Sequence, residues 1–199
     1  EYASIPVINA LTDLLHPCQV LTDLLTIREH KGKELQGLKM AYVGDGNNMT
    51  NSYMYGCAKV GMTFVAATPE DYRPDEIVMK NAIADAKSTG ASITLVTDPK
   101  EAVKDADIIV TDTWASMGQE DEHDARKKIF APYQVNQELL NGADKRAIVM
   151  HCLPAHRGEE ITADVLEANA AVIFDEAENR LHAQKALVEF LINENLKKD

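Results

Sequence analysis

The sequence predicts an α/β fold, a doubly wound parallel sheet with helices on both faces. Six short runs are rich in β-branched and apolar residues, and segments of helix length separate most of them. Several runs are apolar at both odd and even positions, as expected for parallel strands that are covered on both faces. Repeated strand and helix units of this kind build a Rossmann-like sheet. The predicted strands cover residues 40–43, 63–67, 92–96, 107–111, 147–150 and 171–174.

Two helices and one further strand-like segment complete the prediction. The first helix begins after His16, because Pro17 is a favoured first helical residue, and it ends at Gly32. The last segment, residues 181–197, carries apolar residues at helical spacing and predicts a closing helix. Residues 5–11 have the pattern of a strand that starts abruptly, and the first residue is Glu1 rather than Met. We therefore expect a piece of a longer protein.

Charge and cysteine content narrow the range of partners. The 20 basic and 32 acidic residues give a formal net charge of −12, which repels phosphate backbones and anionic lipid. We expect no nucleic-acid partner and no membrane partner, since no signal segment or membrane-length apolar run is present. Cys18, Cys57 and Cys152 are sparse, odd in number and without CxxC spacing. This usage favours a reducing compartment, and we expect a cytoplasmic protein.

Polar segments follow four of the six predicted strands. They cover residues 44–48, 112–118, 151–154 and 175–180. Ligands of an open parallel sheet bind beyond the carboxyl ends of its strands, so these segments hold the candidate functional residues. Any one of them could be an ordinary surface loop. Four at one edge indicate a site for a small polar molecule.

The segment after the first strand has two interpretations. Gly44 and Gly46 suggest a dinucleotide-binding loop, but the third glycine position of that pattern is Met49. The side-chain amides of Asn47 and Asn48 can bind a carboxylate or an ammonium group. Alternatively, both asparagines cap the next helix.

Two other segments carry residues with chemical potential. His16 and Gln19 flank the start of the first helix, where a phosphate or a polarised carbonyl oxygen can bind; simple capping is the alternative. Cys152 lies between His151 and His156, so that a thiol nucleophile, half of a metal site or an anion clamp are all conceivable. No second Cys/His pair has zinc-finger spacing, and a histidine next to a cysteine on a strand points away from it.

Five motifs in one order resemble a known family. They are His-Pro-Cys-Gln at residues 16–19, Gly-Asp-Gly-Asn-Asn at 44–48, Asp-Thr-Trp-Ala-Ser-Met-Gly-Gln-Glu at 112–120, His-Cys-Leu-Pro at 151–154 and Glu-Ala-Glu-Asn-Arg at 176–180. Together they resemble the second, amino-acid-binding domain of the ornithine carbamoyltransferases, within the aspartate/ornithine carbamoyltransferase superfamily. The Ser-Met-Gly signature favours ornithine over aspartate or putrescine as the acceptor.

The resemblance implies two groups of binding residues. The α-amino and α-carboxylate groups of L-ornithine would be held by Asn48, Asp112, Ser116 and the backbone of Met117. An aspartate pairs with an ammonium group, and amide donors suit a carboxylate.

The second group would contact carbamoyl phosphate. It contains His16, Gln19 and Arg180, with His16 and Arg180 countering the negative charge. Cys152 and the Leu153 carbonyl would lie beside the δ-amino group and the carbamoyl carbon. Attack by the neutral δ-amine, a tetrahedral intermediate and loss of phosphate would give citrulline, and no cofactor or metal is required.

The resemblance also implies that half of the active site lies elsewhere. The phosphate-binding Ser-x-Arg-Thr-Arg loop belongs to the first domain of the family, and no such string occurs in this sequence. We expect residues 1–15 to be a remnant of that domain, residues 16–180 to form the ornithine-binding α/β domain, and residues 181–199 to form the C-terminal helix. Relatives are trimers built through the first domain, so we expect a homotrimer of the full-length protein and an inactive fragment.

Three other functions stay open at the level of the sequence. One is a Rossmann-type dinucleotide binder, which Met49 and the lack of an acidic residue after the second strand disfavour. Another is a transcarbamylase for a different amine, and the third is a non-catalytic domain that keeps the amino-acid pocket.

Overall fold

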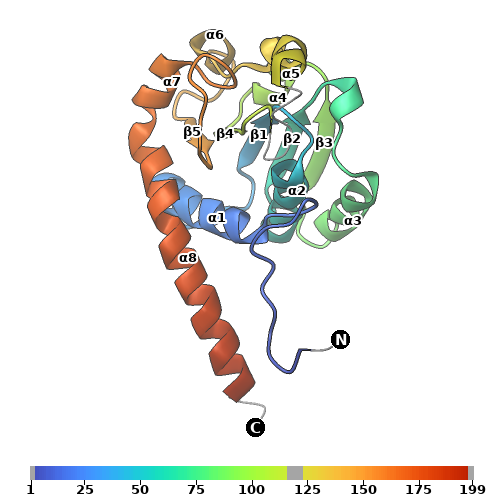
Figure 1. Cartoon of the computed structure of the whole chain (residues 1–199), viewed down its shortest axis with the longest axis vertical. Coiled ribbons are helices and arrows are strands. Elements are labelled where there is room, and N and C mark those ends of the chain that lie inside the picture. Colours follow the sequence, from blue (N-terminus) through green and yellow to red (C-terminus); the bar gives the residue numbers. More distant parts are fainter. Residues whose placement is uncertain (1–2, 116–122, 197–199) are drawn as a thin grey trace.

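Five parallel strands form the centre of the molecule, in the spatial order β3-β2-β1-β4-β5 (Figure 1). The structure is a computed structural model that describes residues 3–115 and 123–196. Five of the six predicted strands are present, each within one residue of its expected bounds, and the predicted α/β fold is confirmed. The strands are β1 (Lys39–Val43), β2 (Thr63–Ala67), β3 (Ser92–Val96), β4 (Ile108–Thr111) and β5 (Ile148–His151).

Helices cover both faces of the sheet because successive strand residues point to opposite sides. Met40 and Tyr42 of β1 join one core with α1, α2 and α3, whereas Ala41 and Val43 join a second core with α4, α6 and α7. The helices are α1 (Pro17–Lys31), α2 (Asn48–Val60), η1 (Glu70–Tyr72), α3 (Glu76–Ala86), α4 (Pro99–Val103), α5 (His123–Phe130), η3 (Ala131–Tyr133), α6 (Gln137–Leu140), α7 (Ala163–Ala168) and α8 (Ala170–Leu196).

The order of the strands reverses between β1 and β4, and this reversal sets the position of the site. β1 pairs with β2 on one side and with β4 on the other, and both pairings are parallel. Ligands of doubly wound sheets bind outside the carboxyl ends of the strands at such a point. The loops that begin at Gly44 and Asp112 follow these two strands, so they meet at that edge.

The sixth predicted strand, residues 171–174, is wrong. These residues belong to the first turns of α8, which has 27 residues and lies against α1 (Figure 1). Val172 and Ile173 are buried, whereas Phe174 is 58% exposed. Periodicity cannot separate a strand from a buried helix in so short an apolar run. The closing helix expected from residue 181 is the C-terminal part of this longer helix.

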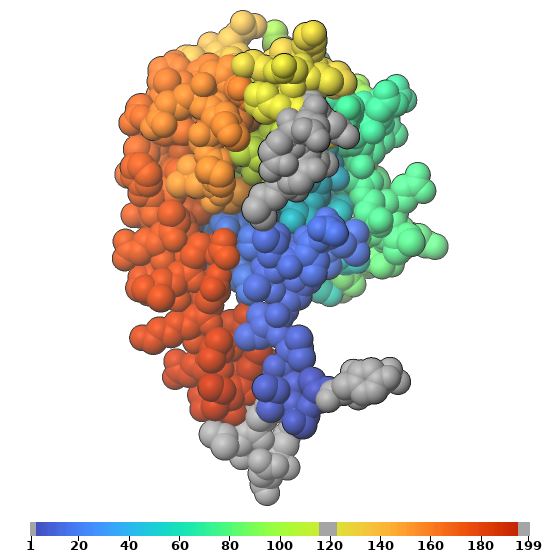
Figure 2. Space-filling model, in the orientation of Figure 1, coloured from blue at the N-terminus to red at the C-terminus, as the bar shows by residue number. Residues whose placement is uncertain are grey.

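The N-terminal segment runs beside the C-terminal half of α8 (Figure 2). The prediction of a strand at residues 5–11 is wrong, because this segment pairs with no strand of the sheet. Ile5, Pro6 and Ile8 instead line a cavity of about 220 Å³ together with apolar residues of α8. Helix α1 begins and ends as predicted. Within the described residues, no helix is long and apolar enough to cross a membrane.

Candidate functional site

Asp112, the first residue after β4, connects three loops at the carboxyl edge of the sheet. Its Oδ2 atom accepts a hydrogen bond from Asn47 Nδ2 at 2.8 Å. Its Oδ1 atom accepts one from Cys152 Sγ at 3.4 Å and one from the Thr113 N–H at 2.8 Å. The loops that follow β1, β4 and β5 therefore converge on one half-buried carboxylate.

The two adjacent asparagines have different roles. Asn47 caps α2, because its Oδ1 atom accepts hydrogen bonds from two backbone N–H groups of the first turn. Asn48 is the first residue of the helix, and its Nδ2 atom donates to the Thr12 carbonyl at 3.0 Å. Asn48, the predicted ornithine ligand, is thus tied to the N-terminal segment. Asn47 is the asparagine that contacts Asp112.

The Cys152 thiol is half-buried and stays protonated. Burial raises the pKa of Cys152 well above its usual range, and the carboxylates of Asp112 and Glu176 raise it further. The thiol therefore donates to Asp112 instead of acting as a thiolate. The imidazole of the neighbouring His151 bonds elsewhere, so the two residues form no nucleophilic Cys-His pair.

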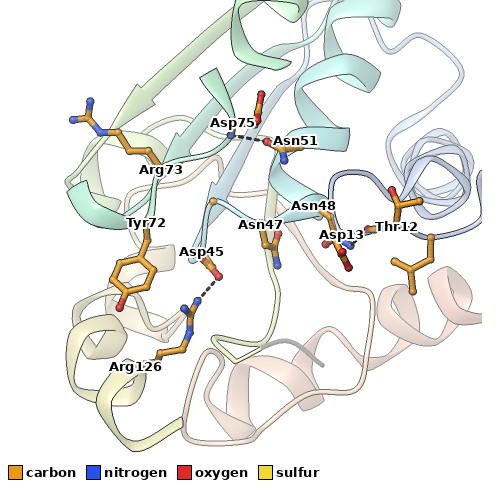
Figure 3. Close-up of a pocket in the computed structure, with 12 residues that line it drawn as sticks. Thr12, Asp13, Asp45, Asn47, Asn48, Asn51, Tyr72, Arg73, Asp75 and Arg126 are labelled. Atoms are coloured by element: carbon orange, nitrogen blue, oxygen red, sulfur yellow. Dashed lines mark hydrogen bonds and ion pairs between the residues drawn. The ribbon is translucent and has the colours of Figure 1, made fainter. Parts of the chain in front are cut away.

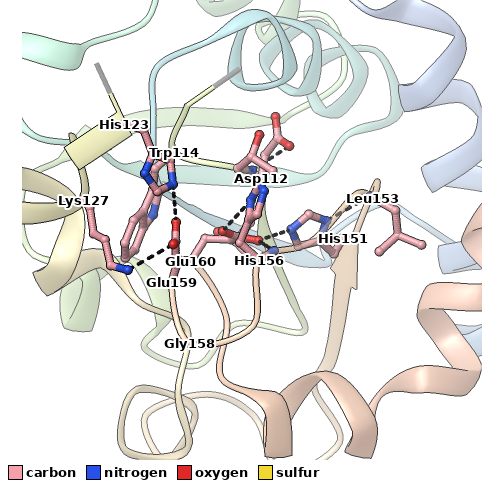
Figure 4. Close-up of polar contacts among 12 residues, drawn as sticks. Asp112, Trp114, His123, Lys127, His151, Leu153, His156, Gly158, Glu159 and Glu160 are labelled. Atoms are coloured by element: carbon pink, nitrogen blue, oxygen red, sulfur yellow. Dashed lines mark hydrogen bonds and ion pairs between the residues drawn. The ribbon is translucent and has the colours of Figure 1, made fainter. Parts of the chain in front are cut away.

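His151 is fully buried and holds the turn after β5 (Figure 4). Its Nδ1 atom accepts from the Leu153 N–H at 2.9 Å, and its Nε2 atom lies 3.1 Å from Glu160 Oε1. Because Nδ1 accepts, the ring proton lies on Nε2 and is donated to Glu160. Leu153 has a φ of 56°, in the left-handed region that disfavours side chains, and a cis peptide bond joins it to Pro154. The imidazole therefore fixes the turn that carries Cys152 and the Leu153 carbonyl.

Glu160 is a fully buried residue that no motif indicated. Its Oε1 atom also accepts from the His156 N–H at 2.5 Å, and its Oε2 atom lies 3.8 Å from His156 Nδ1. His156, Glu159 and Glu160 each offer one atom that could bind a metal ion, and these atoms lie within 4.8 Å of one another (Figure 4). Glu159 is already paired with His123 and Lys127. These ion pairs account for the cluster as a structural part of the turn.

His16, Gln19 and Arg180, which were predicted to contact carbamoyl phosphate, come together where α1 meets α8. Arg180 Nη1 donates to Gln19 Oε1 at 2.5 Å, and the Gln184 amide lies 2.9 Å from Arg180 Nε and Nη2. Burial lowers the pKa of His16, and the nearby Arg180 lowers it further. The imidazole is therefore neutral near pH 7. The role of His16 in countering the charge of the phosphate stays a prediction, and a neutral imidazole leaves Arg180 as the cation among these three residues.

Two buried carboxyl groups lie behind Gln19, and no motif assigned them a role. Gln19 Nε2 donates to Asp23 Oδ1 at 2.8 Å and lies 3.4 Å from Glu176 Oε1. Burial raises the pKa of Asp23 to about 6 and that of Glu176 well above its usual range. Helical spacing could have indicated both residues. Asp23 lies four positions after Gln19 in α1, and Glu176 lies four positions before Arg180 in α8.

A cavity of about 710 Å³ opens beside Asn47 and Asn48 (Figure 3). On one side Arg126 forms an ion pair with Asp45. Burial raises the pKa of Asp45 to about 6, although Arg126 opposes this effect. The walls thus offer amide groups and carboxylates, as a zwitterionic ligand requires. Ser116 and Met117, two predicted ornithine ligands, lie outside the described residues.

The loop after β1 is not open to a dinucleotide. A Cβ atom at Gly46 would lie 2.3 to 2.4 Å from backbone atoms of residues 72–74, and the Gly46 N–H donates to the Tyr72 carbonyl. The protein backbone therefore already occupies the close approach that a pyrophosphate would need. Met49 is buried at the third glycine position. These contacts disfavour the dinucleotide alternative.

Comparison with known proteins identifies the family. The family model described as "Aspartate/ornithine carbamoyltransferase, Asp/Orn binding domain" matches residues 36–191. The chain belongs to this family. The carbamoyl-P binding domain model of the same family matches residues 1–29, which include most of α1. The resemblance to ornithine carbamoyltransferases inferred from the motifs is confirmed. The division of the chain at residues 15 and 180 stays a prediction, and α8 continues without a break through residue 180.

Individual relatives agree with this assignment to the carbamoyltransferase family. The ornithine carbamoyltransferase of Carboxydothermus hydrogenoformans is 56% identical over 191 residues, which are 96% of this chain and 61% of that protein. The crystal structure of ornithine carbamoyltransferase from Gloeobacter violaceus has a TM-score of 0.86 at 56% identity and covers 94% of this chain and 62% of its own. The anabolic enzyme of Campylobacter jejuni has a TM-score of 0.92 at 43% identity, covering 97% and 64%. The chain therefore spans about three-fifths of the length of these relatives.

Proposed function

We propose that this chain supplies the ornithine-binding part of an ornithine carbamoyltransferase. The reaction transfers the carbamoyl group of carbamoyl phosphate to the δ-amino group of L-ornithine and yields L-citrulline and phosphate. The observation that carries the proposal is a hydrogen-bond connection between the two groups of predicted residues. Glu176 faces Gln19 Nε2 at 3.4 Å and accepts from the His151 N–H, and the next residue, Cys152, donates to Asp112. These contacts support a single site formed by the predicted carbamoyl-phosphate residues and the predicted ornithine residues.

In this proposal Asp112 pairs with the α-ammonium group of ornithine. Asn48, Ser116 and the backbone N–H of Met117 bind the α-carboxylate. Asn48 must then exchange its bond to the Thr12 carbonyl for one to the substrate. The cavity beside Asn47 and Asn48 supports this arrangement, because it lies next to the Asp112 cluster.

Carbamoyl phosphate binds on the other side, against α1 and α8. Arg180 provides the positive charge, and Gln19 and His16 provide neutral polar contacts. The Nδ1 atom of His16 is buried without a hydrogen-bond partner among the described residues, so it is available to a substrate atom. The remaining phosphate contacts come from the carbamoyl-P binding domain.

The chemistry requires a neutral δ-amine at the carbamoyl carbon. The amine nitrogen forms the new C–N bond, the C–O bond to phosphate breaks, and the departing phosphate takes up the proton that the amine loses. The Cys152 thiol and the Leu153 carbonyl orient the amine. A protonated thiol cannot accept that proton, so the raised pKa of Cys152 supports an orienting role in the free chain. No step in this reaction uses a cofactor or a metal.

The assembly and the location are proposed on less specific grounds. We infer a homotrimer for the full-length protein from the family resemblance. Cytoplasm is the proposed location, and the three free cysteines Cys18, Cys57 and Cys152 support a reducing compartment. Sedimentation of the full-length protein and imaging of a tagged copy test the two statements.

The experiment compares this chain alone with a chimera in which it follows the first domain of the Gloeobacter violaceus relative. We expect citrulline from the chimera and none from the chain, because the chain lacks the Ser-x-Arg-Thr-Arg string. Aspartate and putrescine should not replace ornithine, and the chain should not bind NAD in a calorimetric titration. Citrulline formed by the chain alone contradicts the fragment proposal. A chimera that folds but transfers no carbamoyl group contradicts the function.

A further inference from the structure

The orientation of the Gln19 side chain is set by its neighbours. Gln19 is 1% exposed, and its Nε2 atom faces the carboxyl oxygens of Asp23 and Glu176. Carboxyl oxygens in these positions accept, so the amide nitrogen must point toward them. The amide oxygen then points the other way, where Arg180 donates to it. An amide that could rotate freely would offer either end.

Asp23 and Glu176 themselves are in hydrogen-bonding contact, and both are fully buried. Two carboxylates cannot both be ionised in such contact, so a proton lies between them. Each of the four carboxyl oxygens also faces a donor. Tyr53 Oη donates to Asp23 Oδ2 at 2.6 Å, and the His151 N–H donates to Glu176 Oε2 at 2.9 Å. Gln19 Nε2 faces the other two oxygens.

The charged and titratable groups around this pair come from every element packed against it. Arg180 of α8 favours ionisation of Asp23, whereas Asp112 beyond β4 disfavours ionisation of Glu176. Tyr53 of α2 and Cys152 beyond β5 are both neutral, because burial raises the pKa of each. One cation thus faces two acids and a third carboxylate. This balance favours a pair that keeps one proton.

We propose that Asp23 and Glu176 share one proton and act as positioning residues that keep the Gln19 amide oxygen directed toward carbamoyl phosphate. The carbamoyl NH₂ group is a donor, so the side chain that faces it must present an oxygen. A rotated amide would oppose two NH₂ groups and leave the carbamoyl donor unpaired, which discriminates strongly in buried sites. The inference rests on the proposed function, because it assumes that carbamoyl phosphate binds at Gln19.

The pair also connects the three elements that carry the site. Asp23 lies in α1 with Gln19, and Glu176 lies in α8 with Arg180. Glu176 also accepts from the N–H of His151, the residue directly before Cys152. A single proton-sharing unit therefore sets the relative positions of the amide, the guanidinium and the thiol. Contacts between residues of a single helix could not fix the positions of three separate elements in this way.

Two substitutions separate positioning from simple structural support. In D23N the orientation that keeps the hydrogen bond from Tyr53 turns the introduced NH₂ group toward Gln19, so the Gln19 amide loses the acceptor that orients its nitrogen. In E176Q the amide oxygen accepts from the His151 N–H, so the NH₂ group replaces only the acceptor that lies 3.4 Å from Gln19 Nε2. Asp23 still accepts from Gln19 at 2.8 Å, so the orientation is kept. We expect D23N to lower kcat/KM for carbamoyl phosphate at least tenfold in the chimera, with the KM for ornithine within threefold. E176Q should stay within threefold for both substrates.

The matched control is D98N, the same exchange at the N-cap of α4, where asparagine caps equally well and no substrate is proposed. D98N should leave kcat/KM unchanged. Carboxyl ¹³C NMR titration of the chain alone provides the second readout. It should show one proton retained by the Asp23 and Glu176 pair at pH 7 in the wild type and none on Asp23 in E176Q.

These readouts distinguish the two levels of inference. A wild-type chimera without activity contradicts the proposed function, while the NMR titration still tests the shared proton. An active chimera in which D23N and E176Q have equal effects on kcat/KM overturns the positioning proposal. If D23N does not fold, the titration decides: a doubly ionised pair at pH 7 overturns the proposal, and one retained proton together with an active E176Q chimera supports it.

Discussion

The two sides of the site are supported in different ways. On the side of α1 and α8, Gln19 and Arg180 rest on a network in which two carboxyl groups share several donors. On the side of β5, the turn that carries Cys152 rests on one imidazole and one carboxylate, His151 and Glu160. Both supports are fully buried. They differ in redundancy. Removal of one donor leaves the carboxyl groups beside Gln19 partly hydrogen-bonded, whereas removal of the His151 ring leaves the turn after β5 without the group that connects Leu153 to Glu160.

Buried carboxyl groups explain this difference in physical terms. An isolated buried carboxylate is costly unless it is hydrogen-bonded, and a pair can lower that cost by sharing a proton. Among the described residues Glu160 has no second carboxyl group with which to share a proton, and it depends on the His151 ring and the His156 N–H. The turn after β5 should therefore be the more sensitive of the two regions.

The largest effect is expected for H151F, which keeps a ring of similar size but loses both of its hydrogen bonds. Glu160 then loses the Nε2–H donor of the imidazole, and the Leu153 N–H loses the acceptor that holds its left-handed backbone. We expect the free energy of unfolding to fall by roughly 3 kcal/mol. Urea-induced unfolding of the chain measures the change.

E160Q provides the control for this prediction. The amide oxygen can still accept from His151 and from the His156 N–H, so its cost should stay under about 1 kcal/mol. The double variant H151F/E160Q should lose less than the sum of the two, because no buried charge is left unpaired. Equal losses in H151F and E160Q would show that the imidazole is not the central link.

The next effect concerns pH and tests the redundant side. The folded chain binds a proton at Asp23 with a pKa of about 6, above the value for an unfolded aspartate. Between about pH 4 and pH 6 the folded state therefore holds a proton that the unfolded chain has released, and stability falls as pH rises. We expect this residue to contribute on the order of 2 kcal/mol over that window. D23N should remove that part of the decline.

Asp45 and Glu176 have the same sign, because the pKa of Asp45 is raised to about 6 and that of Glu176 well above its usual range, so some decline should persist in D23N. The measurement is the difference in unfolding free energy between the wild type and D23N at pH 4, 5, 6 and 7. D98N, an exposed N-cap, should keep the full slope. A slope in D23N identical to that of the wild type would contradict the raised pKa.

A smaller effect is expected at Cys152, on the sensitive side. C152A removes the donor to Asp112, and we expect kcat of the chimera to fall about tenfold, equivalent to about 1.4 kcal/mol. C152S should lose less, since a hydroxyl also donates. C57A is the control, because Cys57 is a buried thiol that contacts Met40 in the core. Turnover that survives C152A intact would favour a non-catalytic role for the turn.

The fold followed from the sequence wherever strands and helices had contrasting patterns. The five central strands were predictable because several of them are apolar on both faces and helical segments separate them. Residues 171–174 and 5–11 misled because a short apolar run is compatible with strand, helix or an exposed segment that packs on α8. Such segments are decided by tertiary packing, which the sequence pattern does not contain.

The candidate site was predictable where motifs lie at strand ends, and less so where support comes from elsewhere. Asp112 and Cys152 could be placed together because both follow neighbouring strands. Glu160 could not, since its role depends on burial against the His151 ring. Helical spacing points to Glu176, but its contact with the His151 N–H depends on the fold. A charged residue is expected to be exposed to solvent when only the sequence is known, and its burial is seen only in the folded structure.

The smallest effects compare Asn47 with Asn48 and test which asparagine serves structure and which serves substrate. N47A loses the cap of α2 and the contact with Asp112, so we expect a loss of about 1 kcal/mol in stability. N48A loses only a bond to the Thr12 carbonyl, and its stability should change by less than about 0.5 kcal/mol. In the chimera, N48A should raise the KM for ornithine more than it changes the KM for carbamoyl phosphate. If N48A instead destabilises the chain as much as N47A, Asn48 is a structural residue, and the carboxylate of ornithine must be bound through Ser116 and Met117.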